Sequence, residues 1–235
     1  MVTEPGAARD EWRAAALWLA AFVACALLFR AVPALDLAAA RAFQDAAGFA
    51  PAKSGVNGLF YWLGDTGAKL LFLALTGAAL LALLGAPPRL RAWRARLTFL
   101  WLALALGPGL LVNVLLKEQV ERPRPYQVVE LGGPQAFVPA FAHPPPGASG
   151  ASFVSGHAAV AFYVGALAWV FPRRRRAWAV AGIGFGLAMG LTRMSAGAHF
   201  LSDVVFALFA VQACSALAAW LVARLLPPDA AAQGG

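Results

Sequence analysis

The sequence predicts an all-α fold: a polytopic membrane helical bundle of about six transmembrane helices, formed as a single domain over residues 1–235. Two observations predict this class. First, 61% of the residues are hydrophobic and only 13% are charged, an apolar content above what a soluble domain of this size needs. Second, long apolar runs recur along the chain, and each can cross a hydrocarbon core of roughly 30 Å.

Six apolar runs are the expected membrane helices. They cover approximately residues 14–32, 66–86, 95–116, 155–171, 177–191 and 202–226. Prolines mark three of the ends, because proline cannot continue a helix without losing a backbone hydrogen bond. The first run is expected to stay as a membrane helix, since no small-residue cleavage site follows it. Cys25 and Cys214 lie inside apolar runs and are expected to pack there, so no disulfide is inferred.

Arginines crowd two short connections, residues 89–96 and 173–176. Short basic loops stay cytoplasmic, so both termini are expected on that side as well. The connections 33–65, 117–153 and 192–201 then face outward. The formal charge of +8 is therefore interpreted as topological. Nucleic-acid binding would need a larger polar surface than this chain has, so no nucleic-acid partner is expected.

Two of the outward connections have a recognisable character. Residues 35–50 place apolar side chains at helical spacing, which predicts an interfacial amphipathic helix. This helix either packs on the bundle as a lid or faces a substrate, and both interpretations stay open. Residues 126–153 are rich in proline, glycine and aromatic residues, and they are expected to form a loop lying over the site.

Cationic side chains open the second of these connections. Lys117 ends a long apolar helix, where an ammonium group either escapes the lipid or binds an anion. Arg124 lies between two prolines that restrict its backbone to an extended course. A guanidinium held there can bind phosphate oxygens in a bidentate way. The neighbouring Glu121 and Arg122 are interpreted as a pair at the surface.

The fourth helix is expected to begin with Ser155, Gly156 and His157. A serine at this position is an ordinary N-cap. The free N–H groups at a helix N-terminus also bind anions, and Gly156 would let a ligand approach the backbone closely. His157 stands at the same place with a proton to give.

The last polar stretch combines Arg193, His199 and Asp203. If the sixth helix starts by His199, residues i and i+4 lie on one face. Asp203 could then accept a hydrogen bond from one imidazole nitrogen and leave the other free as a nucleophile. A purely structural His–Asp pair is the alternative. His143, in the proline-rich loop, is taken as incidental.

Together these residues resemble the three-part motif of the type 2 phosphatidic acid phosphatase (PAP2) superfamily. In order, the parts are Lys117-x6-Arg124-Pro125, Ser155-Gly156-His157 and Arg193-x5-His199-x3-Asp203. They span more than a third of the chain. Two positions depart from the pattern: Val154 stands where the family often has proline, and Thr192 where it often has serine. Val154 should alter only the helix entry, and Thr192 keeps the hydroxyl.

The resemblance implies a PAP2/haloperoxidase-like core and a mechanism. His199 would attack phosphorus to form a phosphohistidine, with Asp203 orienting its ring and His157 protonating the leaving alkoxide. The remaining residues would bind the phosphate oxygens: Lys117, Arg124, Ser155, Gly156 and Arg193. No metal or other cofactor is expected, since no His/Asp/Glu cluster with metal-ligand spacing is evident.

The expected partner is a lipid phosphate in the membrane. The sequence of residues 122–141, together with the segments SFVSGHAA and GAHFLSDVVFA, resembles sequences of a bacterial branch of the superfamily that includes lipid A phosphatases. This implies a Gram-negative inner membrane and a periplasmic site. Undecaprenyl pyrophosphate and phosphatidylglycerophosphate are the rival substrates. A vanadium haloperoxidase would usually lack the membrane bundle. A non-enzymatic anion or lipid transporter would not need the His–Asp pair.

Overall fold

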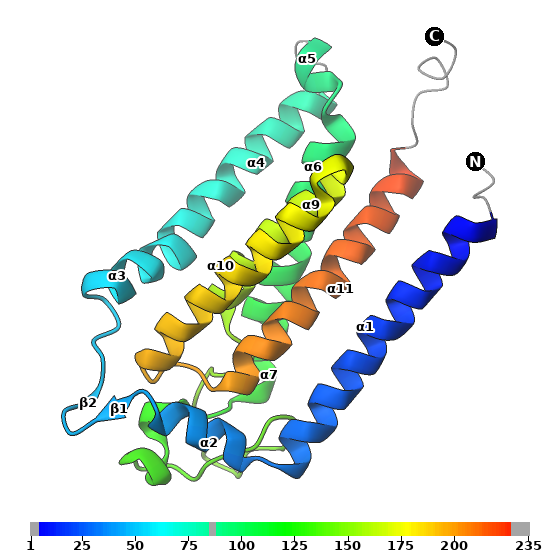
Figure 1. Ribbon diagram of the computed structural model, residues 1–235. Helices are drawn as coiled ribbons and strands as arrows, with labels where there is room; N and C mark the ends of the chain where they lie inside the picture. The colour runs from blue at the N-terminus through cyan, green and yellow to red at the C-terminus, as the bar shows by residue number, and fades with distance from the viewer. Residues whose placement is uncertain (1–4, 85–87, 227–235) are drawn as a thin grey trace.

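The computed structural model describes residues 5–84 and 88–226, and it confirms an all-α membrane bundle (Figure 1). Within these ranges five helical stretches are long and apolar enough to cross a membrane. They are Trp12–Ala31, Gly55–Leu83, Arg94–Leu116, Pro172–Ser195 and Leu201–Leu225. The chain is therefore an integral membrane protein, as its composition predicts.

Several of these stretches are built from more than one element. The first is α1 (Pro5–Ala31); the second joins α3 (Gly55–Trp62), the π-helix η1 (Leu63–Gly67) and α4 (Ala68–Leu83). After α5 (Pro88–Arg91), the third joins α6 (Arg94–Leu104) to the π-helix η2 (Ala105–Leu116). The 3-10 helix η6 (Pro172–Arg174) leads into α10 (Arg175–Ser195), and α11 (Leu201–Leu225) is the last.

The second stretch begins at Gly55, well before the expected residue 66, and residues 85 and 86 of the prediction lie outside the described residues. The early part was missed because Asn57, Gly58, Gly64 and Asp65 interrupt its apolar pattern. A membrane helix accepts such residues where they face protein instead of lipid.

The expected fourth segment is helical but shorter than a usual membrane span. It consists of α8 (Gly156–Phe162), the 3-10 helix η5 (Tyr163–Ala166) and α9 (Leu167–Val170). It contacts α10, α11 and η2 and lies at the centre of the bundle. Ala158, Ala159 and Ala161 are fully buried, so these small side chains let the neighbouring helices approach closely.

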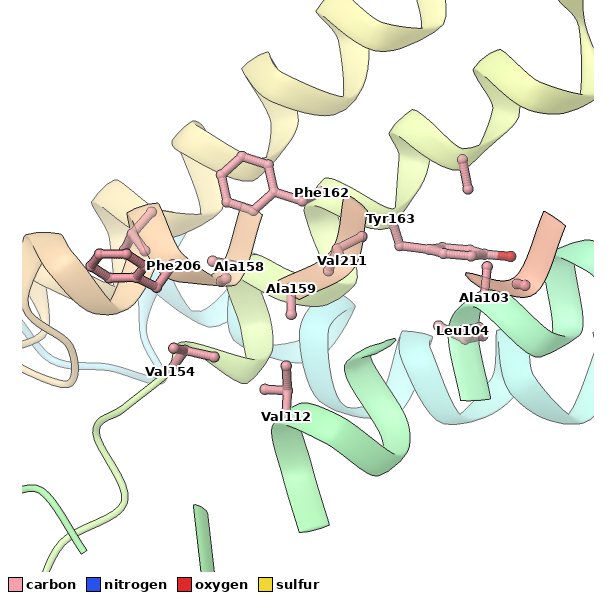
Figure 2. Close-up of a cluster of buried hydrophobic side chains, with 14 of the residues drawn as sticks. Ala103, Leu104, Val112, Val154, Ala158, Ala159, Phe162, Tyr163, Phe206 and Val211 are labelled. Carbon is pink, nitrogen blue, oxygen red and sulfur yellow. The ribbon is translucent and has the colours of Figure 1, made fainter. Parts of the chain in front are cut away.

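The apolar core surrounds this central segment, as Figure 2 shows. Val154, Ala158 and Phe162 lie near Phe206 and Val211 of α11, while Ala103, Leu104 and Val112 come from α6 and η2. The hydroxyl of Tyr163 donates to the carbonyl of Leu100 at 2.8 Å, which satisfies its one buried polar group. The core thus fixes the position of the residues at the start of α8.

Apart from α5 and the central segment, all the short elements outside the membrane stretches gather at one end of the bundle (Figure 1). They are α2 (Ala34–Arg41), strands β1 (Gln44–Asp45) and β2 (Gly48–Phe49), α7 (Lys117–Val120) and the 3-10 helices η3 (Pro125–Gln127) and η4 (Val129–Leu131). The start of α1, α5 and the end of α11 lie at the opposite end.

The prediction of one helix over residues 35–50 is wrong in its second half. The helix α2 ends at Arg41, and residues 44–49 form a small antiparallel hairpin. The side chain of Asp45 accepts a hydrogen bond from the N–H of Ala47 at 2.8 Å, and Gly48 adopts a φ of +98°. Both features favour a tight turn over a continuing helix. The amphipathic part is therefore restricted to α2.

Candidate active site

The start of α8 has the predicted N-cap. Ser155 is buried with extended backbone angles, and its hydroxyl oxygen accepts from the N–H of Ala158 at 3.3 Å. Its own N–H donates to the carbonyl of Asp203 at 3.0 Å, which ties α8 to the first turn of α11. Ser155 thus has a structural role whatever it also binds.

Gly156 gives Lys117 access to the start of α8. A Cβ at Gly156 would lie 2.7 Å from Oδ1 of Asn113 and 3.0 Å from Nζ of Lys117. Any larger residue would push both side chains away. Gly156 therefore acts through the space it leaves for these two side chains, and the predicted close approach of a ligand stays a prediction.

A proline in the third membrane helix prepares the position of Lys117. Pro108 lies inside the π-helix η2, and its carbonyl accepts from Nδ2 of Asn113 at 2.6 Å. Oδ1 of Asn113 in turn accepts from Nζ of Lys117 at 2.5 Å. Burial lowers the pKa of Lys117, and the nearby charge of Arg124 lowers it further. The ammonium is therefore held inward and is not simply escaping the lipid.

Arg124 has the predicted extended backbone, with φ −83° and ψ 159° between its two prolines. Its N–H donates to Oε1 of Gln127 at 2.8 Å, which fixes the start of η3. The half-buried guanidinium acts electrostatically on both Lys117 and His199. Three predicted site residues therefore share one electrostatic environment.

His157 packs into a recess in the second membrane helix. A Cβ at Gly64 of η1 would lie 2.4 Å from Cδ2 of His157, so the ring occupies the space that this glycine leaves. The ring of Tyr61 lies 5.0 Å away, centroid to centroid. The Nε2 atom is buried and has no hydrogen-bond partner among the described protein atoms. A buried polar atom of this kind can bind a ligand or a water molecule.

Arg193 faces the same tyrosine from α10. It is 2% exposed, and its Nη2 donates to the carbonyls of Ala52 at 3.3 Å and Asn57 at 3.1 Å. Its guanidinium carbon lies 5.4 Å from the centre of the Tyr61 ring. The Nε atom is buried without a partner among the described residues. Arg193 and His157 thus each keep one buried nitrogen without a protein partner among the described residues.

His199 is held by a backbone carbonyl. Its Nδ1 lies 2.7 Å from the carbonyl oxygen of Ser152 and 3.6 Å from Oδ2 of Asp203. A carbonyl can only accept, so Nδ1 carries the proton and Nε2 has a free lone pair. Burial lowers the pKa of His199, with Asp203 opposing the shift, so the ring is neutral at pH 7.

The predicted hydrogen bond from His199 to Asp203 is therefore wrong. The prediction assumed that the last helix begins by His199, but α11 begins at Leu201. Asp203 is the third residue of that helix, and its Oδ2 accepts from the N–H of Phe200 at 2.7 Å and from the hydroxyl of Ser152 at 2.5 Å. Asp203 therefore acts on the imidazole through its charge, 3.6 Å from Nδ1, and also by holding Ser152.

Arg122 is the largest departure from the sequence interpretation. It is 1% exposed and is not paired with Glu121 at the surface. Its Nη1 lies 2.6 Å from Oδ1 of Asp203, and its Nη2 lies 2.8 Å from Oδ2 of Asp36 on α2. Further contacts reach the carbonyl of Val138 and the hydroxyl of Ser202, both at 2.8 Å. Sequence reasoning thus missed Asp36, Arg122, Ser152 and Ser202. The sequence has no signal that separates these four residues from ordinary polar residues. The burial of Arg122, two residues before Arg124, becomes visible only in the structure.

The described residues contain no group of three or more His, Cys, Asp or Glu side chains arranged to hold a metal ion. The site instead gathers Lys117, Arg124 and Arg193 around two imidazoles, and His157 lies within electrostatic reach of Lys117, Arg193 and His199. Buried cationic and imidazole side chains gathered at one end of a membrane bundle mark a candidate functional site.

Comparison with known proteins identifies the family. The PAP2 superfamily matches residues 96–227, more than half of the 235-residue chain, and the chain belongs to this superfamily. The matched part contains every predicted site residue.

Curated relatives have similar sequences over part of their length. A lipid A 4'-phosphatase of Francisella tularensis subsp. novicida is 36% identical over 116 residues, 48% of this chain and 52% of the relative. A lipid A 4'-phosphatase of Rhizobium etli is 43% identical over 103 residues, 43% of this chain and 40% of the relative. A lipid A 1-phosphatase of the same organism is 40% identical over 98 residues. The chain spans about half or less of the length of these relatives.

A solved structure has the same fold. It is a transmembrane PAP2-type phosphatidylglycerolphosphate phosphatase from Bacillus subtilis, with a TM-score of 0.54 and 17% sequence identity. The match covers 88% of this chain and 96% of that one. At this identity the likeness concerns the arrangement of the helices.

Proposed function

We propose that the chain is a membrane lipid phosphatase that hydrolyses a phosphomonoester or pyrophosphate of a lipid through a phosphohistidine on His199. The hydrogen bond between Nδ1 of His199 and the carbonyl of Ser152 carries the proposal. It leaves Nε2 of a neutral ring as the nucleophile, in a site that also holds Lys117, Arg124, Arg193 and a second imidazole, His157.

The first step transfers the phosphoryl group to the protein. Nε2 of His199 forms a bond to phosphorus while the bond between phosphorus and the ester oxygen breaks. His157 donates its proton to the leaving oxygen, so the lipid departs as an alcohol, or as a lipid monophosphate when the substrate is a pyrophosphate. The imidazole then carries a positive charge, which Asp203 and the Ser152 carbonyl stabilise from behind.

The second step returns the enzyme to its starting state. His157 now accepts a proton from water, whose oxygen bonds to phosphorus as the P–Nε2 bond breaks, and phosphate leaves. In both steps Lys117, Arg124 and Arg193 neutralise the phosphate oxygens. Polar groups of Ser155 and Gly156, at the start of α8, bind these oxygens as well. These cations occupy the role that a metal ion has in many phosphoryl transfers.

A lipid A-like phosphate is the favoured substrate. The support is the similarity to lipid A phosphatases from two genera, although each match covers only part of the relative. The site lies where the helices end and α2, η3 and η4 gather, a position that suits a phosphate whose acyl chains stay in the bilayer. The arginine-rich connections lie at the opposite end, which supports cytoplasmic termini and a periplasmic site in a bacterial inner membrane.

Phosphate release from purified lipids tests the proposal. The panel contains lipid A, phosphatidic acid, phosphatidylglycerophosphate and undecaprenyl pyrophosphate, each assayed in excess EDTA. Release is expected to persist in EDTA and to disappear in the His199→Ala protein, with lipid A hydrolysed fastest. His143→Ala, the exposed histidine outside the site, is the matched control. Wild-type release by His199→Ala would contradict the mechanism, and loss of activity in EDTA with recovery in magnesium would contradict metal independence.

A transporter would behave differently in the same preparation. Vesicles that take up or flip a lipid phosphate without releasing phosphate would support the alternative class. Faster release from undecaprenyl pyrophosphate or phosphatidylglycerophosphate would keep the phosphatase and change its substrate.

A further inference from the structure

The buried charges behind His199 are not balanced. Asp36 and Asp203 are both fully buried and flank Arg122, whose two terminal nitrogens each bind one carboxylate. Burying charge is costly unless every polar atom has a partner, and here the partners are present. When both carboxylates are ionised, this cluster of Asp36, Arg122 and Asp203 carries one net negative charge.

The contacts of Asp36 favour its ionised form. Its Oδ1 accepts from the N–H of Ser202 at 2.8 Å, and its Oδ2 accepts from the hydroxyl of Ser202 at 2.6 Å and from Arg122. All three partners donate, which suits a carboxylate and not a protonated acid. Burial raises the pKa of Asp36, and the guanidinium of Arg122 opposes that shift.

Arg122 alone would neutralise Asp203. A guanidinium paired with one carboxylate presents no net charge to a neighbouring imidazole. Asp36 engages the second terminal nitrogen of the same guanidinium, so the charge of Asp203 is only partly compensated. The cluster also holds Ser152, whose N–H donates to the carbonyl of Arg122 at 3.1 Å and whose hydroxyl donates to Asp203.

We propose that Asp36 is a positioning residue for the proposed reaction: it keeps Arg122 from neutralising Asp203, so that His199 faces one net negative charge. This charge is matched to the cationic imidazole that exists only while His199 carries the phosphoryl group. The proposal rests on the proposed function and gives a role to α2, which contains no motif residue.

Other charged groups also face His199 and are common to every variant compared below. Arg124, from the connection after α7, acts on it electrostatically, as does His157 from α8. Arg193 of α10 acts on His157. A change confined to the cluster therefore alters the charge behind the ring without altering the phosphate-binding side.

Three variants separate the effect of the cluster's net charge on His199 from the effect of a disturbed structure. Asp36→Asn makes the cluster neutral, Arg122→Gln gives it two negative charges, and the double variant restores one. Since a negative charge favours the protonated imidazole, we expect the pKa of His199 to fall by about one unit in Asp36→Asn and to rise by about one unit in Arg122→Gln. The double variant should return to within about 0.3 unit of wild type.

The ring pKa is read from the ¹³C resonances of histidine in the purified full-length protein, with His199 assigned by its loss in His199→Ala. The acid limb of kcat/KM for phosphatidic acid in mixed micelles should move in the same directions, and turnover in Asp36→Asn should fall about tenfold. Asp45→Asn, an exposed carboxylate on the adjacent hairpin, is the control and should leave both readouts unchanged.

A purely structural cluster gives a different pattern. Shifts of the same sign in the two single variants, no shift, or a double variant that does not recover would each overturn the proposal. If Arg122→Gln does not fold, the comparison of Asp36→Asn with the double variant decides. If the wild-type protein releases no phosphate but the resonances shift as expected, the charge assignment stands and the proposed function fails.

Discussion

The arginines at the two ends of the bundle differ in what surrounds them. At the end that carries the site, Arg122 and Arg193 are almost fully buried, and each nitrogen with a partner meets a specific carbonyl, hydroxyl or carboxylate. At the opposite end, Arg173 to Arg176 are exposed, and Arg175 lies 6.0 Å from the centre of the Trp169 ring. Arg96 and Arg224 lie over Trp93 and Trp220 in the same way.

The difference separates buried arginines with specific partners from exposed arginines of the same charge, and we expect the functional ones among the first group. Arginines over indole rings at the end of a helix are typical of the membrane–water interface, where their charge sets topology. A buried guanidinium with an unpaired Nε, such as Arg193, is costly unless a ligand completes it. The two ends should therefore respond differently to the same substitution.

Neutralising one arginine at each end is expected to give the largest contrast. Arg193→Gln removes a cation that we expect to contact phosphate oxygens in the transition state, so kcat/KM should fall by about 10²- to 10³-fold. Arg174→Gln should change kcat/KM by less than about twofold, because its side chain is exposed at the other end. Initial rates of phosphate release measure both. Equal effects would show that burial does not separate the two groups.

The two ends should also lie on opposite sides of the membrane. Cys25 and Cys214 are first replaced by alanine, and single cysteines are introduced at the exposed residues Glu130 and Arg174. The nearby Gly133 is left unchanged, because a Cβ there would lie 2.1 Å from the carbonyl carbon of Gln127. In spheroplasts a membrane-impermeant maleimide should label position 130 fully and position 174 only after permeabilisation. The reverse pattern would place the site on the cytoplasmic side.

The sequence predicts the fold class and most of the bundle because membrane helices have a simple signal, a long apolar run. The motif residues can be predicted from the sequence as well, because their spacing is local or conforms to a family pattern. The structure brings Lys117, Arg124, His157, Arg193 and His199 within electrostatic reach of one another. Their catalytic roles stay predictions until the variants are measured.

The support behind the nucleophile could not be predicted, because it is made by contacts distant in sequence. Arg122 and Asp36 are 86 residues apart, and Ser152 and Asp203 are 51 apart. Nothing in the local pattern of Asp36 separates it from an ordinary polar residue of an amphipathic helix. The start of α11 also differs from the prediction: the helix begins at Leu201, two residues after His199, and Nδ1 of His199 lies 3.6 Å from Oδ2 of Asp203, beyond hydrogen-bond distance.

Gly64 and Gly77 lie in the same membrane-spanning stretch, Gly55–Leu83. Replacing each by alanine tests how closely this stretch must approach the site. Gly64→Ala would place a methyl group 2.4 Å from the His157 ring and displace it, so turnover should fall about tenfold. Gly77→Ala, one helix segment away, meets nothing within 4 Å and should keep activity while stabilising its helix by up to about 1 kcal/mol. Steady-state kinetics and melting temperature in detergent measure the two effects. Full activity in Gly64→Ala would show that the ring can move without cost.

The smallest expected effect concerns pH at the site end. Burial lowers the pKa of His199 from its ordinary value of 6.5, so the ring stays neutral and Nε2 stays free as the pH falls from 8 through that value. The acid limb of kcat/KM that belongs to His199 should therefore lie below pH 6.5, and the Arg174→Gln control should share it. Because a phosphate monoester also titrates near pH 6, the profile is repeated with an aryl phosphate monoester, which is still hydrolysed at its P–O bond but has a lower second pKa. A limb that stays in place for both substrates belongs to the protein. A limb above pH 6.5 that does not follow the substrate would mean that Asp203 and the Ser152 carbonyl stabilise the protonated ring more strongly than burial destabilises it.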